Sequence, residues 1–272
     1  MGRSDRHPDN GELTMPLWNG HAVSVPGNGH IRREIPCQDA CGLWFAPRPC
    51  LIVCDGRGSA KLSHLGACAA VKAFRSQCAV MEARLASLLD TRRCNARDWL
   101  HFCQLMIRTV CQQKVELAEE YGCPENEFDF TIAFAVLGQR RIGFFQVGDG
   151  ALVVCRKGEC QVVFLPDKGE FENQTRFLHP GDDLKRKFQA VMLNAAGVTG
   201  LAASSDGPEY LMFELQTMTP GPIFTQMFDD LAAGRFTRQS VLDYLTGSRW
   251  AHDPRGNDDR SLAILSLTGE KQ

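Results

Sequence analysis

Residues 50–68 read CLIVCDGRGSAKLSHLGAC, and this stretch decides the fold because it combines a strand, a turn and the start of a helix. Leu51 to Cys54 are four apolar residues in a row, which is typical of a buried strand. The run stops at Asp55-Gly56, and the small and apolar residues from Ser63 onward predict a helix. The turn therefore presents a carboxylate at the end of a buried strand, beside a glycine whose backbone can approach a ligand closely. The same residues are equally compatible with an Asp-Gly turn that has no chemical role.

Two other expected strand ends also carry carboxylates. Residues 201–205 (LAASS) form a small, apolar run that ends in Asp206-Gly207, and Asp258-Asp259 opens into residues 261–267 (SLAILSL). Folding can bring three such strand ends together into one site. Carboxylates are hard oxygen ligands and no cluster of cysteine and histidine accompanies them, so the pattern favours Mg²⁺ or Mn²⁺ over Zn²⁺.

The composition is that of an ordinary globular protein. The 272 residues are 44% hydrophobic and 23% charged, which is enough for one large domain with a buried core. A net charge of −2 gives no general electrostatic reason to bind nucleic acid or an anionic membrane. No apolar run approaches the ~20 residues that span a bilayer, and residues 1–17 lack the hydrophobic segment of a signal peptide. We therefore expect a cytoplasmic protein that contacts neither nucleic acid nor membrane, with residues 1–17 as a disordered tail.

The 12 cysteines lie mostly within apolar runs, where free cysteine behaves as a small buried hydrophobe. A soluble chain without a secretion signal belongs in a reducing compartment. Cys37 and Cys41, then Cys50 and Cys54, repeat a C-x₃-C spacing, but no matching Cys/His pair follows at zinc-finger distance. We therefore favour core packing over a zinc site.

The rest of the chain consists of short apolar runs and of segments with helical spacing. Strands are expected at 18–26, 43–45, 51–54, 130–137, 142–147, 151–155, 188–193, 201–205 and 261–267, and helices at 63–78, 82–89, 98–121, 222–233 and 237–245. Strands on both sides of a group of helices indicate an α+β fold, with sheets packed together and helices outside. We expect one domain over 18–268, with an irregular excursion at 166–200 and a tail at 269–272.

Asp149-Gly150 separates two of the expected strands. Asp-Gly between apolar runs is the strongest short-range signal for a β-hairpin. The sequence therefore predicts a hairpin here, and it favours a structural role over a catalytic one for Asp149.

Five short motifs, in this order along the chain, resemble the bacterial branch of the metal-dependent type-2C Ser/Thr protein phosphatases, the PPM family. Each motif is weak by itself, but each stands in the expected strand or turn context, and the similarity covers roughly residues 20 to 268. The motifs are Gly29-His30 with Gln38-Asp39-Ala40; Val53-Cys54-Asp55-Gly56 with Gly58-Ser59-Ala60; Val147-Gly148-Asp149-Gly150; Ser205-Asp206-Gly207; and Asn257-Asp258-Asp259-Arg260-Ser261.

The resemblance implies an α-β-β-α sandwich, in which two antiparallel sheets flanked by helices enclose a site for two Mg²⁺ or Mn²⁺ ions. By the same resemblance, Asp55 bridges both ions, the Gly56 carbonyl contributes a ligand, and Asp206 and Asp258 complete the protein ligands. Asp39 is expected to hold metal-bound water, so that Asp39 and Asp55 are the catalytic residues. Gln38 and Asp259 are expected to lie beside these ligands. Asp129 is the candidate ligand for a third ion.

The chain departs from the family pattern at three positions. Gln38 stands where many members have glutamate, although the bacterial branch often has glutamine. Arg57 replaces a histidine that serves some members as the proposed general acid, so the sequence assigns no group to protonate the leaving group. Glu34 occupies the place of the family's phosphate-binding arginine, and we expect His30 and Arg33 to take over that contact.

The resemblance implies a phosphatase that hydrolyses phospho-Ser and phospho-Thr in proteins through a metal-activated water, without a phosphoenzyme. Its partner would be a phosphorylated protein, such as a bacterial Ser/Thr kinase or a kinase substrate, in signalling. The alternative is a catalytically weak pseudophosphatase that acts as a phosphoprotein-binding or regulatory module, which Gln38 and Arg57 motivate. Retention of Asp55, Asp206 and Asp258 argues against it, because an inactive site has no reason to keep three repelling carboxylates. A phosphoesterase for small molecules ranks last, because no aromatic cluster accompanies the motifs.

Overall fold

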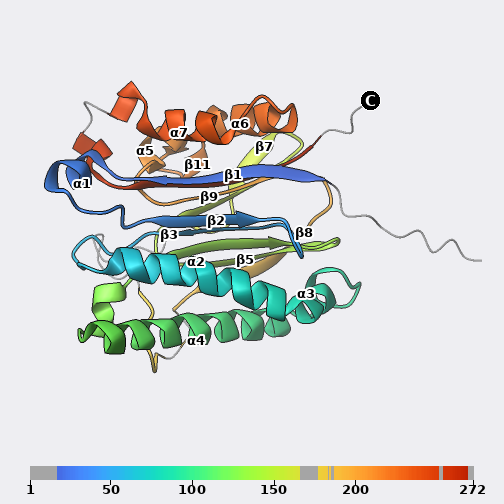
Figure 1. The fold of residues 1–272 in the computed structure, drawn as a ribbon. Coiled ribbons are helices and arrows are strands. Elements are labelled where there is room, and N and C mark those ends of the chain that lie inside the picture. Colours follow the sequence, from blue (N-terminus) through green and yellow to red (C-terminus); the bar gives the residue numbers. More distant parts are fainter. Residues whose placement is uncertain (1–16, 166–176, 183, 185–186, 251–253, 269–272) are drawn as a thin grey trace, which may run out of the picture.

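The computed structural model describes residues 17–165, 177–182, 184, 187–250 and 254–268. Two five-stranded antiparallel sheets pack face to face, and helices cover the outer face of each sheet (Figure 1). The predicted α-β-β-α sandwich is therefore confirmed. None of the helices in these ranges is long and apolar enough to cross a membrane.

The strands of the two sheets come from both ends of the chain. The first sheet contains, in order, β1 (Trp18–Val25), β12 (Arg260–Leu267), β9 (Val198–Ser204), β6 (Ala151–Arg156) and β7 (Glu159–Val162). The second contains β2 (Ala40–Trp44), β3 (Cys50–Cys54), β4 (Ile132–Leu137), β5 (Arg141–Val147) and β8 (Gln189–Asn194).

The main helices lie on opposite sides of the sandwich. The second sheet is covered by α2 (Ser63–Val80), α3 (Glu82–Leu89) and α4 (Ala96–Tyr121), and the first by α6 (Pro222–Ala232) and α7 (Arg238–Thr246) (Figure 1). The short elements are α1 (Asn28–Arg33), α5 (Glu209–Met212), β10 (Phe213–Glu214), β11 (Thr219–Pro220) and the 3₁₀ turns at Glu125–Phe128, Ser248–Trp250 and Pro254–Asn257.

Three apolar layers hold the sandwich together: one between each sheet and its helices, and one between the sheets. Strand β3 shows why its sequence is apolar without alternation. Ile52 packs into the layer below the helices, whereas Leu51 and Val53 pack into the layer between the sheets. A strand that is covered on both faces needs apolar side chains at every position, and this is the pattern of residues 51–54.

Helix α4 is docked on β5 by one large side chain. Trp99 is 1% exposed, and its indole Nε1 donates a hydrogen bond to the Phe144 carbonyl at 3.1 Å. Its ring occupies the space above Gly143, where a Cβ atom would lie 2.3 Å from the ring. The missing side chain at Gly143 is therefore what lets the helix approach the sheet.

The predicted hairpin at Asp149 is wrong. Strand β5 pairs with β4 and β8 in one sheet, whereas β6 pairs with β7 and β9 in the other. Residues 148–150 therefore carry the chain from sheet to sheet. An Asp-Gly turn between two apolar runs is compatible with either geometry, and long-range pairing decides between them.

Two other local features differ from the expectations. Strand β7 follows β6 where no strand was expected, and β9 begins at Val198, within the predicted excursion at 166–200. Strand β8 confirms the strand expected at 188–193, whereas residues 166–176, 183 and 185–186 fall outside the described ranges. The same is true of residues 1–16 and of the predicted tail at 269–272.

The contact between Trp99 and Gly143 can be tested by Gly143→Ala. The added methyl group must displace the indole ring, so we expect the free energy of unfolding to fall by about 1–3 kcal/mol, measured by urea denaturation. Gly58→Ala is the matched control for stability, because a Cβ atom there meets nothing within 4 Å. Equal stability of the two variants would show that α4 does not depend on this close approach.

Candidate active site

One pocket at the ends of several strands gathers most of the acidic residues that the motifs indicated. Its volume is 490 Å³, and we call it the acidic pocket. It contains all four predicted metal-ligating residues. Its lining consists of Asp55, Gly56, Arg57, Gly58, Ser59, Asp129, Thr131, Asp149, Phe177, His179, Asp206 and Asp258.

Strand pairing explains why these residues meet. β9 and β12 are antiparallel neighbours in which Ser204 pairs with Leu262, so Asp206 just after β9 lies near Asp258 just before β12. β6 pairs with β9 on its other side and begins at Ala151, and this brings Asp149 to the same edge. Asp55 arrives from β3 in the other sheet, so the pocket lies where both sheets end.

The turn after β3 is fixed by hydrogen bonds that extend the sheet. The Thr131 backbone N–H donates to the Asp55 carbonyl at 2.8 Å, and the Asp55 N–H donates to Thr131 Oγ1 at 3.2 Å. Gly56 then forms an isolated antiparallel bridge with Phe130. The Asp55 side chain is therefore held by backbone pairing beyond the end of its strand.

Asp259 is buried, connects three segments through its hydrogen bonds, and does not line the acidic pocket. It is 2% exposed, and Oδ1 accepts hydrogen bonds from the Gly27 N–H at 2.7 Å and from His30 Nδ1 at 2.8 Å. Oδ2 accepts from the Gln38 N–H at 2.6 Å. Gly207 also packs against this residue, because a Cβ atom there would lie 1.9 Å from the Asp259 carbonyl oxygen.

The predicted phosphate-binding residues do not line the acidic pocket. His30 is 6% exposed and is engaged with Asp259, and Arg33 Nε donates to the Gly29 carbonyl at 3.0 Å. Among the described residues of the lining, the basic side chains are instead Arg57 and His179. Arg57 is 40% exposed in its side chain, so it can reach a ligand at the mouth of the pocket.

Asp39 and Gln38 lie buried behind the pocket. Asp39 is 5% exposed, and burial raises its pKa to about 8 against the opposing effect of hydrogen bonds with Ser205 and Ser261; its Oδ2 has no partner. Gln38 donates from Nε2 to the Ala60 carbonyl at 2.7 Å, and its Oε1 also has no partner. Two buried acceptor oxygens are therefore left without a donor.

Burial and neighbouring carboxylates raise the pKa of the acidic groups in the site. Burial raises the pKa of Asp55 well above its ordinary value, and the charges of Asp39, Asp206 and Asp258 raise it further. Burial and the charges of Asp258 and Asp149 likewise raise the pKa of Asp206. Burial is also the main reason that the pKa of Asp258 is raised. The cluster therefore either takes up protons or attracts a cation.

The residues present fit a divalent cation. Asp206 Oδ1 is buried and has no hydrogen-bond partner, and the donor set consists of oxygen atoms, which Mg²⁺ and Mn²⁺ prefer. Within the described ranges, no three acidic, histidine or cysteine side chains converge closely enough to enclose an ion by themselves.

Asp129 differs from the other acids of the pocket because the chain itself supplies its cations. It is fully buried, and Lys114 Nζ lies 2.5 Å from Oδ1 while Arg57 Nη1 lies 3.3 Å from Oδ2. Sequence reasoning missed Lys114, although its position could have been noticed. It stands four residues after Val110 and four before Ala118, on the apolar stripe of the predicted helix.

The sequence favoured a structural role over a catalytic one for Asp149, and the structure places this residue in the lining of the acidic pocket. The Val147-Gly148-Asp149-Gly150 motif was the available signal.

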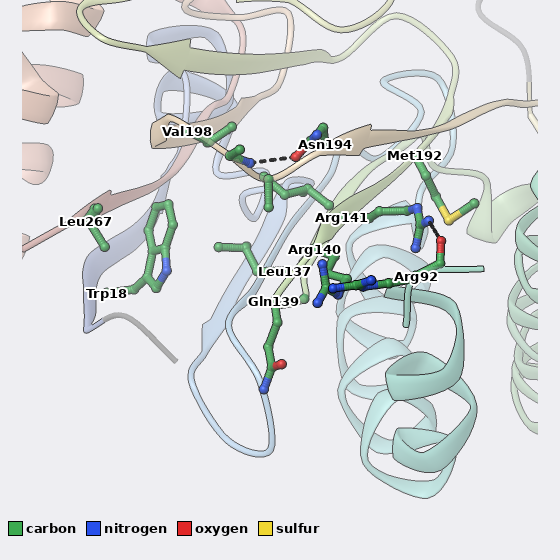
Figure 2. A pocket seen from close by; sticks show the side chains of 14 residues that line it. Trp18, Arg92, Leu137, Gln139, Arg140, Arg141, Met192, Asn194, Val198 and Leu267 are labelled. Atoms are coloured by element: carbon green, nitrogen blue, oxygen red, sulfur yellow. Dashed lines mark hydrogen bonds between the residues drawn. The ribbon is translucent and has the colours of Figure 1, made fainter. Parts of the chain in front are cut away.

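A roomier cavity of 620 Å³ lies at the other end of β3 and β4 (Figure 2). Leu137 lines this cavity, and its N–H donates a hydrogen bond to the Pro49 carbonyl just before β3, so the cavity lies where β3 begins and β4 ends. Figure 2 shows Arg141 turned toward Arg92, and its guanidinium donates to the Thr91 and Arg92 carbonyls at 2.6 and 2.9 Å. None of the described residues that line this cavity carries a carboxylate, so it offers no metal ligands of the acidic type.

Comparisons with known proteins identify the family of this chain. The family model described as "Protein phosphatase 2C" matches residues 26–246. The chain is 28% identical over 260 residues to Serine/threonine-protein phosphatase 3 of Escherichia coli (strain K12), and the match covers 91% of this chain and 97% of that protein.

Solved structures share the fold. The Mycobacterium tuberculosis serine/threonine phosphatase PstP/Ppp matches with a TM-score of 0.58 and 18% identity, over 93% of this chain and 99% of that chain. The catalytic domain of the serine threonine protein phosphatase PstP in complex with two manganese ions matches with a TM-score of 0.61 and 14% identity, over 94% and 100% of the two chains. The match to the family model, which spans most of the chain, confirms the resemblance that the five motifs predicted. This chain belongs to the protein phosphatase 2C family of Ser/Thr protein phosphatases.

Proposed function

We propose that this protein removes phosphate from phospho-Ser and phospho-Thr in proteins at the acidic pocket, with two Mg²⁺ or Mn²⁺ ions. The observation that carries this proposal is the convergence of Asp55, Asp206 and Asp258 from the ends of three different strands. Burial raises the pKa of all three carboxyl groups, neighbouring carboxylates raise it further, and Asp206 keeps a buried oxygen without a partner. Such an arrangement is unfavourable unless cations join it.

The residues of the pocket would have different roles in the reaction. Asp55 and the Gly56 carbonyl lie on the turn fixed by Thr131, and they would hold ions together with Asp206 and Asp258. Divalent ions bound there would acidify a water molecule and neutralise negative charge on the phosphate during in-line attack. Asp39, buried behind Asp55, would orient water through its unpartnered oxygen.

Arg57 is the group best placed to bind the phosphate of the substrate. Its guanidinium reaches the mouth of the pocket, and its planar set of N–H donors matches phosphate oxygens. A guanidinium stays protonated at any physiological pH, so Arg57 would bind negative charge and would not transfer a proton. His30 is buried against Asp259 and the exposed Arg33 is hydrogen-bonded within helix α1, so we assign neither of them to the phosphate.

The substrate class follows from the family, and the partner is proposed from its chemistry. A protein that carries phospho-Ser or phospho-Thr, such as a Ser/Thr kinase or a protein that the kinase phosphorylates, would present its phosphate at the pocket. All 12 cysteines are free, which supports work in a reducing compartment such as the cytoplasm.

The first experiment measures hydrolysis of p-nitrophenyl phosphate and of a phosphothreonine peptide with Mn²⁺, with Mg²⁺ and with EDTA. We expect activity that needs the metal and that falls by at least about 100-fold in Asp55→Asn and in Asp206→Asn, because each removes a charge that holds the ions. Both variants should fold, and removal of a repelling charge should raise the melting temperature of the metal-free protein.

The matched control is Asp229→Asn, which removes an exposed carboxylate on α6. It should leave both activity and metal dependence unchanged. Unchanged turnover in Asp55→Asn or Asp206→Asn would contradict the site assignment. Binding of Mn²⁺ without turnover on either substrate would favour the regulatory module, and Gln38 and Arg57 would then be the residues to replace.

The role of Arg57 can be separated from metal binding. Arg57→Met should raise KM for the phosphopeptide several-fold and leave the affinity for Mn²⁺ unchanged, whereas Arg57→Lys should keep part of the effect because it keeps the charge. Arg33→Met is the direct comparison for the alternative expected from the sequence. A larger rise in KM for Arg33→Met than for Arg57→Met would return the phosphate contact to Arg33.

A further inference from the structure

Lys114 is a buried cation directly beside the acidic pocket. The residue is 2% exposed, although it lies on a helix with one face in water. Its ammonium group lies 2.5 Å from Asp129 Oδ1, and it donates a second hydrogen bond to the Leu178 carbonyl at 2.6 Å. Lysine is almost never fully buried unless it is paired, and here both of its contacts are strong acceptors. The ammonium is therefore a fixed part of the pocket wall.

Both carboxylate oxygens of Asp129 already face a cationic group of the chain. It is fully buried, with Lys114 at Oδ1 and Arg57 Nη1 at 3.3 Å from Oδ2. His179 Nδ1 also lies 3.8 Å from Oδ1. A divalent ion on this carboxylate would approach the Lys114 ammonium, and the two positive charges would repel each other at short range. The residues around Asp129 therefore do not fit the third ion for which the sequence made it the candidate.

We propose that the Lys114 ammonium takes the place of a third divalent ion at Asp129, and that it positions the wall of the acidic pocket through Asp129 and Leu178. The wall consists of two segments. Asp129 holds the guanidinium of Arg57, and Leu178 stands between Phe177 and His179, which both line the pocket. The Arg57 guanidinium also lies 5.7 Å from the centre of the Phe177 ring. One ammonium therefore links α4, the residues before β4 and the chain at 177–179.

A cation supplied by the chain has a different consequence from a bound ion. The occupancy of a metal site rises and falls with metal concentration, whereas Lys114 is present in every molecule. Arg57 would therefore be in position even at metal concentrations that only just fill the Asp55 site. Lys114 acts through other residues and touches no substrate atom, so it is a positioning residue. Only the kinetic part of the test rests on the proposed function.

The decisive measurement is the number of Mn²⁺ ions bound, by equilibrium dialysis with metal analysis. The wild type and Asp129→Asn should bind the same number of ions, because Asp129 is not a ligand. Lys114→Met should bind one additional, weaker ion, and the double variant Lys114→Met/Asp129→Asn should lose it again. Lys72→Met, which removes an exposed lysine from α2, is the matched control and should match the wild type. If Asp129→Asn binds one Mn²⁺ ion fewer than the wild type, the proposal is overturned.

A second readout needs neither metal nor activity. Lys114→Met and Asp129→Asn should each lower the melting temperature of the metal-free protein, because each single substitution leaves the charge of the other residue buried. The melting temperature of the double variant should fall by less than the sum of the two single decreases. Additive losses would show that the pair is not coupled and would overturn the proposal. This cycle stays informative if the wild type proves to bind no metal, an outcome that would contradict the proposed function alone.

The kinetic readout tests positioning. At saturating Mn²⁺, Lys114→Met should raise KM for the phosphopeptide, as Arg57→Met does. Lys114→Arg should raise KM less, because it keeps the charge. The effect of Lys114→Met should be much smaller once Arg57 is already methionine, because both changes act through one group. Independent, multiplicative effects of the two substitutions would show that Lys114 does not act through Arg57.

Discussion

Repulsion between the carboxylates of the acidic pocket is the interaction on which the rest of the site depends. Asp55, Asp206 and Asp258 line one pocket, where burial and the charges of Asp206 and Asp258 raise the pKa of Asp55, and burial and the charge of Asp258 raise the pKa of Asp206. Like charges so placed separate unless the backbone holds them. Here it does, because β9 and β12 are hydrogen-bonded neighbours and the pairing after β3 continues to Gly56. The stability of the two sheets therefore holds together a charge cluster that would not assemble by itself.

Neighbouring acids have opposite tasks in this site. Asp258 lines the pocket, whereas Asp259 turns inward and accepts three hydrogen bonds from the segments at Gly27, His30 and Gln38. A buried carboxylate that accepts several N–H bonds is well compensated. Asp259 therefore fixes the last strand to the N-terminal part of the chain, and this fixes the position of Asp258 one residue earlier. The chemical role of one acid depends on the structural role of the next.

The pocket compensates its negative charge in two ways. At Asp129 the compensating cations, Lys114 and Arg57, are part of the chain and are fixed when the protein folds. At Asp55, Asp206 and Asp258 the described chain offers no such partner, so the compensating charge would come from solvent or from ions. Asp129 and the uncompensated carboxylates line the same pocket.

Local sequence patterns determined most of the elements of this protein. The apolar run at 51–54, the helical spacing of 98–121 and the Asp-Gly ends at Asp55 and Asp206 each record burial or a turn within a few residues of the chain. The five motifs in their order also determined the family, and they identified the residues that line the acidic pocket from three strands. These features could be predicted because each depends on neighbouring residues and on one buried face.

Only the tertiary structure decided which distant groups share a surface. The turn at Asp149 gave no local sign that it crosses between sheets, because a hairpin and a crossing need the same flexible residues. Lys114 looked like one more charge on a helix until Asp129 was placed against it, and His30 proved to be a partner of Asp259, outside the pocket lining. In each case the decisive contact joins residues that are far apart in the sequence, or it depends on strands that pair with distant strands. The free energy of such contacts depends on burial and charge in the assembled fold, which no local pattern contains.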